Sequence, residues 1–460
     1  MPLQVLVAVA LPLVVLSIDF SGVAVALPRI ATDLGTTTAS AGWVINAFAL
    51  GAAGPLLVSG RIADRHGRRR LLLIGVSLFT VGTAGAALAP TFGVLVLARV
   101  VQGVATSLFM TASLSVVSTA YADRRAWAIG MWSAIGSTAA AAAPVIGGVV
   151  VDGLGWRWFF ALNLPLLAVA VGMILRHVPE STGDRRPIDV VGAVLVTVSI
   201  SLVVFGLQEA GNFGWTDLMV VVPGAAGLVT FALFVLQQRH GAVRLVDTAI
   251  TGARAYRPPV TVAFLANWGF GAINILLTFW LQQARGESAA MTGVVFLAYS
   301  VPFAVLGAST GRVVARTGTR APMAFGMLLV AGSFLVLTQL GATSAMWVVL
   351  VAMALSGVGQ GLAYNVSTTA AMAAVPDEDA GVASGLLTAV RNVGVAAGVA
   401  VATLATAVPV GTTGTATDFT SGLRGAAWVI AAVSALGCLV AVRAVGAESG
   451  RTRRPDPSVR

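Results

Sequence analysis

The residues best placed to do chemistry are two charged side chains within apolar stretches, Asp19 and Arg99. Asp19 is the one carboxylate well inside such a stretch, where insertion scales put the cost of a charge at roughly 2.5–3.5 kcal/mol. Burial opposes the charged form of a carboxyl group and a nearby arginine favours it, so a group under both influences is suited to bind and release a proton. We predict that Asp19 carries a proton and that Arg99 is its partner; the alternative is a fixed salt bridge.

The two arginines within apolar stretches each have two interpretations. Arg99 is followed by Gln102 and Thr106 at i+3 and i+7, on one helical face. Arg391 lies near Asn392 and Gly394. Either arginine can face the protein interior, or its long side chain can reach the membrane interface as an anchor.

Polar residues form stripes on two further apolar segments. Asn267, Gly271, Asn274, Thr278 and Gln282 follow one another at spacings of four, three, four and four, which is one face of a helix. Ser356, Gln360 and Tyr364 repeat the pattern. Such stripes either join helices by hydrogen bonds or line a water-filled cavity, and two of them favour the cavity. The residues predicted to line it are Asn46, Gln102, Asn267, Trp268, Asn274, Thr278, Gln360, Tyr364 and Arg391.

A short polar motif runs from Gly60 to Arg70. We expect it to be a tight turn, in which Gly67 adopts a backbone conformation that other residues avoid. Asp64 can accept hydrogen bonds from an arginine or a helix N-terminus, a contact that breaks when the two parts separate. The motif therefore predicts a conformational latch, and the alternative is a topology signal alone. The latch residues are Gly60, Asp64, Arg65, Gly67 and Arg68.

A second motif contains Pro144, Gly147 and Gly148 at the end of an apolar stretch. Proline removes a backbone donor and bends a helix, and glycines allow close packing. A gating hinge and a packing seam are both consistent with it.

The elements that position these residues are membrane-spanning helices. Of the 460 residues, 57% are hydrophobic and 10% are charged, which excludes a water-soluble globular protein. Apolar runs of about 20 residues recur along the chain, the length that crosses a bilayer. We predict an all-α polytopic membrane protein with about fourteen spans, near 3–28, 41–60, 71–89, 93–117, 126–150, 159–176, 188–208, 217–236, 258–283, 291–311, 321–341, 346–373, 383–408 and 426–445.

The net charge of +10 reports topology rather than nucleic-acid binding. All 28 basic residues are Arg, in short clusters between apolar runs. With the N-terminus in the cytoplasm, 22 lie inside, four lie outside and two lie within spans. This bias predicts that both termini are cytoplasmic. We expect no nucleic-acid partner.

An internal repeat divides the chain. Gly60–Arg69 recurs as Gly311–Arg320, offset by 251 and eight spans later, so the two halves run parallel, as in transporters. We predict a six-helix bundle over 1–177, two inserted helices within 178–257, a second six-helix bundle over 258–445 and a basic cytoplasmic tail over 446–460.

Enzymatic and metal chemistry find little support. His66, His177 and His240 fall in predicted loops, Cys438 is the one cysteine, and no P-loop is present. We predict no catalytic residues, no metal and no cofactor, and a proton gradient as the energy source. A facilitator or importer, and a non-transporting membrane sensor or scaffold, stay open as alternatives.

Several segments resemble the major facilitator superfamily. Gly60–Arg70 is similar to its loop signature. Asp19–Pro28, Trp43–Leu50, Arg99–Gly103 and Trp156–Pro165 resemble its 14-helix drug:proton antiporter branch. Ala139 and Ala143 stand where the branch usually has Gly, and Phe48 where it often has Tyr.

The resemblance implies two six-helix bundles plus two central helices, and export of small amphipathic drugs or antibiotics in exchange for protons by alternating access. It implies proton coupling at Asp19 and Arg99, and an antiporter-motif hinge at Pro144, Gly147 and Gly148. We expect a monomer in the plasma membrane. One interior acid against two bases predicts neutral, anionic or at most monovalent cargo.

Overall fold

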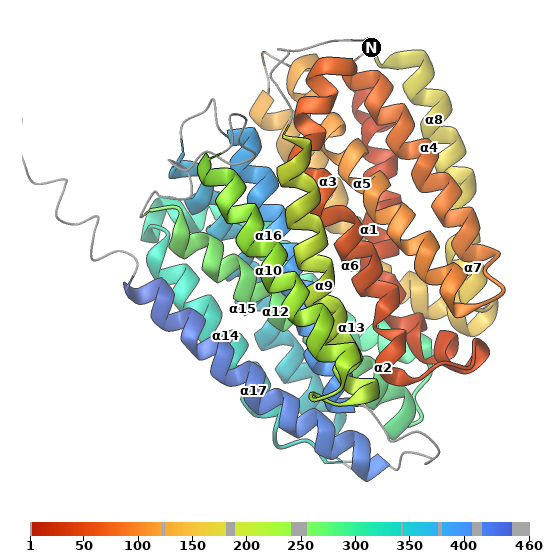
Figure 1. Ribbon diagram of the computed structural model, residues 1–460, viewed down its shortest axis with the longest axis vertical. Helices are drawn as coiled ribbons and strands as arrows, with labels where there is room; N and C mark the ends of the chain where they lie inside the picture. The colour runs from red at the N-terminus through yellow and green to blue at the C-terminus, as the bar shows by residue number, and fades with distance from the viewer. Residues whose placement is uncertain are drawn as a thin grey trace, which may run out of the picture.

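The computed structural model describes residues 2–121, 123, 125–180, 189–240, 255–341, 344–375, 380–406 and 416–443, and its regular elements there are helices (Figure 1). The tail predicted over 446–460 lies outside these residues. Eight helices form the N-terminal half: α1 (Pro2–Asp33), α2 (Thr38–Ala41), α3 (Trp43–His66), α4 (Arg68–Ala87), α5 (Phe92–Ala120), α6 (Arg125–Gly153), α7 (Trp156–Ala161) and α8 (Asn163–His177).

Two helices follow, α9 (Val190–Phe213) and α10 (Leu218–His240). The C-terminal half comprises α12 (Arg257–Phe279), the π-helical turn η2 (Trp280–Ala284), α13 (Ala289–Thr317), α14 (Arg320–Leu337), α15 (Met346–Ala373), α16 (Ala380–Thr406) and α17 (Ala416–Arg443).

The helices coincide with the predicted spans. Within the described part, twelve helical segments are long and apolar enough to cross a membrane. The two other predicted spans fall on α3 and α6, which hold shorter apolar stretches, Trp43–Ala52 and Thr138–Gly153. The all-α membrane architecture is thus confirmed, and the number fourteen stays a prediction.

The predicted turn between the second and third spans is smaller than expected. Helix α3 continues through the motif to His66, and α4 begins at Arg68, so Gly67 alone separates them with φ +103°. The second copy has the same form, because α13 ends at Thr317 and Gly318 follows with φ +70°. Glycine is the residue that adopts positive φ without steric cost. Both copies of the repeat therefore end a helix in the same way.

The helices pack in a pattern that relates the two halves. Helix α1 packs on α6 and α12 packs on α16, while the halves meet where α3 contacts α16 and where α6 contacts α13. Helix α9 lies against α3 and α16, and α10 packs on α9 (Figure 1). Phe231 and Leu233 of α10 are about half exposed, as expected for a lipid-facing surface.

The lower end of Figure 1, opposite the N-terminus, holds direct contacts between the halves. Asp152, at the end of α6, accepts hydrogen bonds from the backbone N–H groups of Ala289 (3.1 Å) and Ala290 (2.6 Å) at the start of α13. The Gln282 amide donates to the carbonyl of Val25 at 2.9 Å. The lower end is therefore closed by α1 and α6 on one side and α12, η2 and α13 on the other.

Candidate functional site

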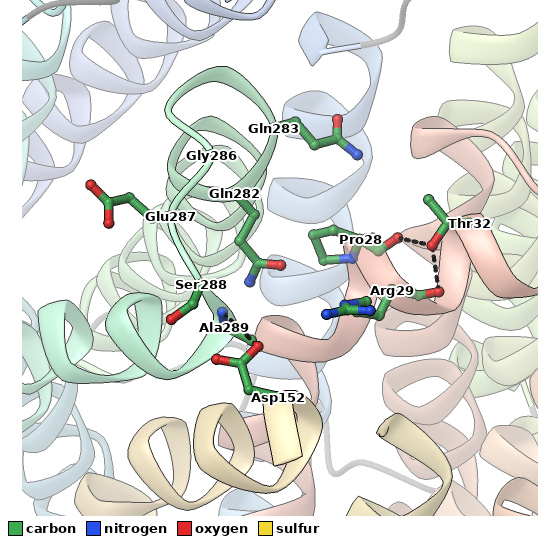
Figure 2. Close-up of a pocket in the computed structure, with 10 residues that line it drawn as sticks. All are labelled: Pro28, Arg29, Thr32, Asp152, Gln282, Gln283, Gly286, Glu287, Ser288 and Ala289. Atoms are coloured by element: carbon green, nitrogen blue, oxygen red, sulfur yellow. Dashed lines mark hydrogen bonds between the residues drawn. The ribbon is translucent and has the colours of Figure 1, made fainter. Parts of the chain in front are cut away.

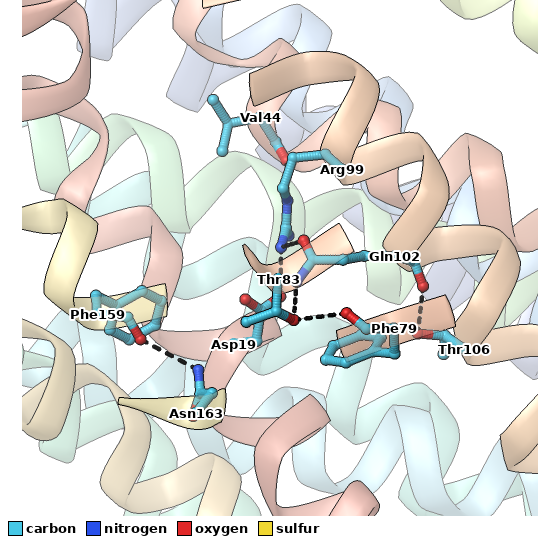
Figure 3. Close-up of polar contacts among 9 residues, drawn as sticks. All are labelled: Asp19, Val44, Phe79, Thr83, Arg99, Gln102, Thr106, Phe159 and Asn163. Atoms are coloured by element: carbon cyan, nitrogen blue, oxygen red, sulfur yellow. Dashed lines mark hydrogen bonds and ion pairs between the residues drawn. The ribbon is translucent and has the colours of Figure 1, made fainter. Parts of the chain in front are cut away.

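The predicted pair of charges is formed. An Arg99 Nη1–H donates to Asp19 Oδ2, and both side chains are fully buried (Figure 3). Arg99 does not reach an interface, so the anchor interpretation of this residue is wrong. Asp19 Oδ1 and Arg99 Nη2 have no hydrogen-bond partner. The carboxylate therefore keeps a free oxygen that a proton can occupy.

Neighbouring polar groups fix the orientation of the Arg99 guanidinium. Its Nε–H donates to the carbonyl of Val44 at 2.8 Å, and Nη1 also donates to Gln102 Oε1 at 2.9 Å. The Gln102 amide donates in turn to Thr83 Oγ1 at 2.9 Å (Figure 3). Gln102 on α5 thus connects the charged pair to Thr83 on α4, and its predicted role in lining a cavity stays a prediction. Because Arg99 keeps these partners, its position does not depend on the charge of Asp19 alone.

Aromatic rings cover the guanidinium. The Arg99 Cζ lies 4.5 Å from the centroid of Phe48 and 5.9 Å from that of Phe160, within the range of cation–π attraction. Phe48 is the residue that stands where related proteins were expected to have Tyr. Here the ring provides a cation–π contact, which a phenylalanine supplies without a hydroxyl group.

The predicted polar stripe of α12 is bonded mainly within its own helix. Asn267 and Asn274 each donate to a carbonyl four residues earlier, of Ala263 and Phe270, both at 2.8 Å. Thr278 is fully buried and its hydroxyl has no partner, and the indole N–H of half-buried Trp268 has none either. Their predicted role in lining a cavity stays a prediction.

The stripe of α15 joins helices. Gln360 donates to the carbonyl of Ala266 on α12 at 2.6 Å. Tyr364 is half-buried and its ring lies against Arg391, whose Cζ is 3.8 Å from the ring centroid. Arg391 is 6% exposed and donates through Nη2 to the Tyr364 carbonyl (2.8 Å) and to Thr368 Oγ1 (2.5 Å). Arg391 thus points into the protein rather than to an interface.

Asn46 reveals a residue that sequence reasoning missed. Its amide donates to Gln208 Oε1 of α9 at 2.6 Å, and the Gln208 amide donates to Thr403 Oγ1 of α16 at 3.2 Å. Gln208 is fully buried and links both halves. The predicted span ended at residue 208, whereas α9 continues to Phe213, so the sequence placed Gln208 at a membrane surface. A single glutamine in the last turn of an apolar run does not indicate from sequence that it will be buried or bonded to other helices.

The side chain of Asp64 lies outside the described part of the structure, and only the helical backbone is described at Gly60, so the latch stays a prediction. Arg65 is exposed, and Arg68 donates to Thr119 at 2.7 Å. The start of α4 does hold a carboxylate contact, because Glu180 accepts from the backbone N–H of Arg69 at 3.1 Å.

The glycines of the second motif lie at a seam. A Cβ at Gly147 would meet the carbonyl of Gly22 at 2.9 Å, and one at Gly148 would meet the carbonyl of Ala289 at 2.3 Å. The Pro144 carbonyl faces Gly293 in the same way, at 2.2 Å from a built Cβ. These residues let α6 approach α1 and α13 closely. A packing seam is therefore present, and a hinge at the same place stays a prediction.

A cavity of about 360 Å³ lies at the lower end, between the halves (Figure 2). Most of its lining residues are polar, it lies beside the Asp152 contact, and sequence reasoning did not predict it. Its lining residues are Pro28, Arg29, Thr32, Asp152, Gln282, Gln283, Gly286, Glu287, Ser288 and Ala289. Within the described residues, no group of three His, Cys, Asp or Glu side chains is placed to hold a metal ion.

Comparison with known proteins identifies the family. The model of the Major Facilitator Superfamily matches residues 9–253 and 260–460. A multidrug resistance protein, Stp, of Mycobacterium tuberculosis (strain CDC 1551 / Oshkosh) is 35% identical over 403 residues, 87% of this chain and 75% of that protein. The tetracenomycin C resistance and export protein of Streptomyces glaucescens is 31% identical over 405 residues, 87% of this chain and 75% of that protein.

Solved structures support the same fold. A crystal structure of the peptide transporter POT in complex with sulfate superposes with a TM-score of 0.70, covering 96% of this chain and 94% of that one at 17% identity. At that identity the similarity concerns the fold alone. The chain belongs to the major facilitator superfamily.

Proposed function

We propose that this protein exports small amphipathic drugs or antibiotics from the cytoplasm in exchange for protons. The observation that carries the proposal is the buried Asp19–Arg99 pair, in which one carboxylate oxygen has no partner. A buried ion pair is costly to form because both charges lose their hydration. Charged residues within membrane-spanning segments are therefore rare, and they generally have a function. The relatives named for multidrug resistance and for tetracenomycin C export support the choice of cargo.

Protonation of Asp19 would change the energy of the pair. The neutral acid loses its Coulomb attraction to Arg99, while Arg99 keeps its bonds to the Val44 carbonyl and to Gln102. The carboxyl group can then relocate, and α1 with it, relative to α5. Because α1 also contacts α6, α12 and α13, a shift of α1 is transmitted to the boundary between the halves.

The lower end is the extracytoplasmic end in this proposal, because the arginine bias puts the termini in the cytoplasm. The contacts of Asp152 and Gln282 then form the external gate, closed in this structure. Alternating access requires these contacts to break when cargo leaves. The N-terminal and C-terminal six-helix bundles would rock about the seams at α3–α16 and α6–α13, with the protein acting as a monomer in the plasma membrane.

A direct test uses proteoliposomes that contain the purified protein, a trapped pH-sensitive dye and an imposed proton gradient. A panel of antibiotics is added to one sample at a time. We expect at least one compound to dissipate the gradient with wild-type protein and to leave it unchanged in protein-free liposomes. Cargo movement without any proton movement would refute antiport, and a panel that moves neither would count against export of this class.

A further inference from the structure

A continuous row of aromatic rings connects the two buried arginines. Consecutive ring centroids lie 5.6, 6.3, 5.8, 5.9 and 5.7 Å apart, all within the range of favourable aromatic contact. Arg99 lies over the first ring and Arg391 over the last. In order, the six residues of this aromatic row are Phe48, Phe20, Phe270, Tyr299, Phe303 and Tyr364.

The row crosses the boundary between the halves. Phe20 of α1 stacks on Phe270 of α12 with an interplanar angle of 19°. Both rings lie mid-helix, in helices that pack on several neighbours, yet both keep part of their surface exposed. Phe303 and Tyr364 are also half-buried. The row therefore has rings with partly exposed surface at and beside the boundary between the halves, and aromatic surface of this kind can stack on a planar aromatic molecule.

The two ends of the row differ in charge. Arg99 is neutralised by Asp19, whereas no carboxylate of the described residues pairs with Arg391. The side chains that contact Arg391 are neutral: the ring of Tyr364 and the hydroxyl of Thr368. Its Nε–H is buried and has no partner. Among the described residues, the Arg391 end of the row thus has a positive charge without a paired carboxylate, and one free donor.

The contacts of Arg391 within the protein satisfy its buried charge only in part. Nη2 donates two hydrogen bonds and the guanidinium has the cation–π contact with Tyr364, but Nε–H has no acceptor and none of the described carboxylates pairs with the charge. A purely structural arginine would be expected to have a counter-ion or a full set of acceptors. An anionic group of a ligand would supply both.

We propose that the aromatic row and Arg391 form the cargo site for a planar aromatic anion, whose rings stack between the halves and whose acidic oxygen accepts from Arg391 Nε. The inference rests on the proposed export function and names its cargo class. It also assigns separate roles to the two arginines, Arg99 to the proton and Arg391 to the cargo. Because the two sites are separate, the proton and the cargo can bind in different steps of one transport cycle.

The test measures binding of two fluorescent probes, pyrene-1-carboxylate and pyrene-1-carboxamide, to the purified full-length protein in detergent. The probes share the ring system and differ in charge. We expect wild type to prefer the carboxylate. Arg391→Gln should weaken carboxylate binding about tenfold or more and amide binding less than about threefold, since a charge-assisted hydrogen bond is lost only for the acid.

The stacking component is tested by Phe270→Leu, which should weaken both probes about two- to tenfold. The matched controls are Phe231→Leu on the exposed face of α10 and Arg424→Gln, whose Nε bonds the Leu340 carbonyl at the lower end. Neither control should change either affinity. Thermal unfolding of each variant shows that it is folded, and Arg391→Lys, which keeps the charge, should retain part of the acid preference.

Equal weakening of acid and amide by Arg391→Gln would overturn the charge assignment, and so would a wild type that binds neither probe. Equal effects of Phe270→Leu and Phe231→Leu would overturn the row. These results leave proton-coupled export of other cargo intact. That proposal fails on a separate result, the absence of proton movement with transported cargo.

Discussion

Replacement of Asp152 by asparagine should weaken closure of the lower end. Asp152 accepts two backbone hydrogen bonds at the first turn of α13, from the opposite half of the molecule. Asparagine keeps one acceptor oxygen, so Asp152→Asn removes one charge-assisted bond, of roughly 1.5–3 kcal/mol when fully buried. It also removes the attraction of a negative charge to a helix N-terminus, about 0.3–1 kcal/mol.

Because Asp152 is exposed, solvent screening reduces this sum, and we expect a net loss of about 1–2 kcal/mol. That loss lowers the ratio of closed to open molecules at the lower end about 5- to 30-fold. The assay is a spin-label distance measurement between Leu154→Cys and Trp347→Cys, two exposed positions in opposite halves, in a Cys438→Ser background. The ratio of the longer-distance to the shorter-distance population should rise by that factor.

The matched control is Asp217→Asn. Asp217 accepts from the backbone N–H of Met219 at the start of α10, within one element rather than between the halves. Asp217→Asn should leave the distance distribution unchanged. Distributions that coincide for wild type and Asp152→Asn, or that shift equally in both variants, would refute a role of Asp152 in closure.

Three further predictions concern the seam, the charged pair and pH. Gly293→Ala should lower the unfolding temperature and abolish cargo export, because the new Cβ would lie 2.2 Å from the Pro144 carbonyl. Gly332→Ala, with open space around the new Cβ, should leave both properties unchanged. Equal effects of the two changes would contradict close packing of α6 on α13. Arg99→Ala should lower the free energy of unfolding by about 3–5 kcal/mol, because it leaves Asp19 without a counter-charge. The double variant with Asp19→Asn should lose less stability than the sum of the two single changes. Strict additivity would argue against an interaction between the two side chains. Burial raises the pKa of Tyr256 to about 12 against the opposing charge of Arg391, so the neutral phenol is favoured in the folded state. The stability difference between wild type and Tyr256→Phe should therefore be constant below pH 10 and shrink between pH 10 and 12, and a difference that grows over that range would be inconsistent with this sign.

Much of the fold was predictable because the bilayer restricts what a sequence can do. Apolar runs of membrane length had to be helices, and the repeat of Gly60–Arg69 at Gly311–Arg320 predicted related local structures, which Gly67 and Gly318 confirm. The pairing of Asp19 with Arg99 followed from the scarcity of charge in the interior. Helix ends were less predictable: α17 starts at Ala416, ten residues before the predicted span, because a helix can continue beyond the apolar region.

The parts of the site that sequence reasoning missed depend on contacts between distant segments. The role of Gln208 depends on its hydrogen bonds to Asn46 and Thr403, which lie more than 160 residues away in either direction of the chain. The aromatic row draws on five helices, and an isolated phenylalanine in an apolar helix gives no sign of its neighbours. Polar spacing was also ambiguous, since Asn267 and Asn274 bond their own helix.

The central claim, that Asp19 carries the coupled proton, is tested most directly by comparing two transport modes of Asp19→Asn in proteoliposomes. Counterflow exchanges labelled for unlabelled cargo without net proton movement, whereas uphill accumulation requires the proton gradient. Asparagine is close in size to aspartate and can still accept a bond from Arg99, so we predict that Asp19→Asn retains counterflow and loses gradient-driven accumulation. Accumulation at the wild-type rate and pH dependence in Asp19→Asn would contradict the claim.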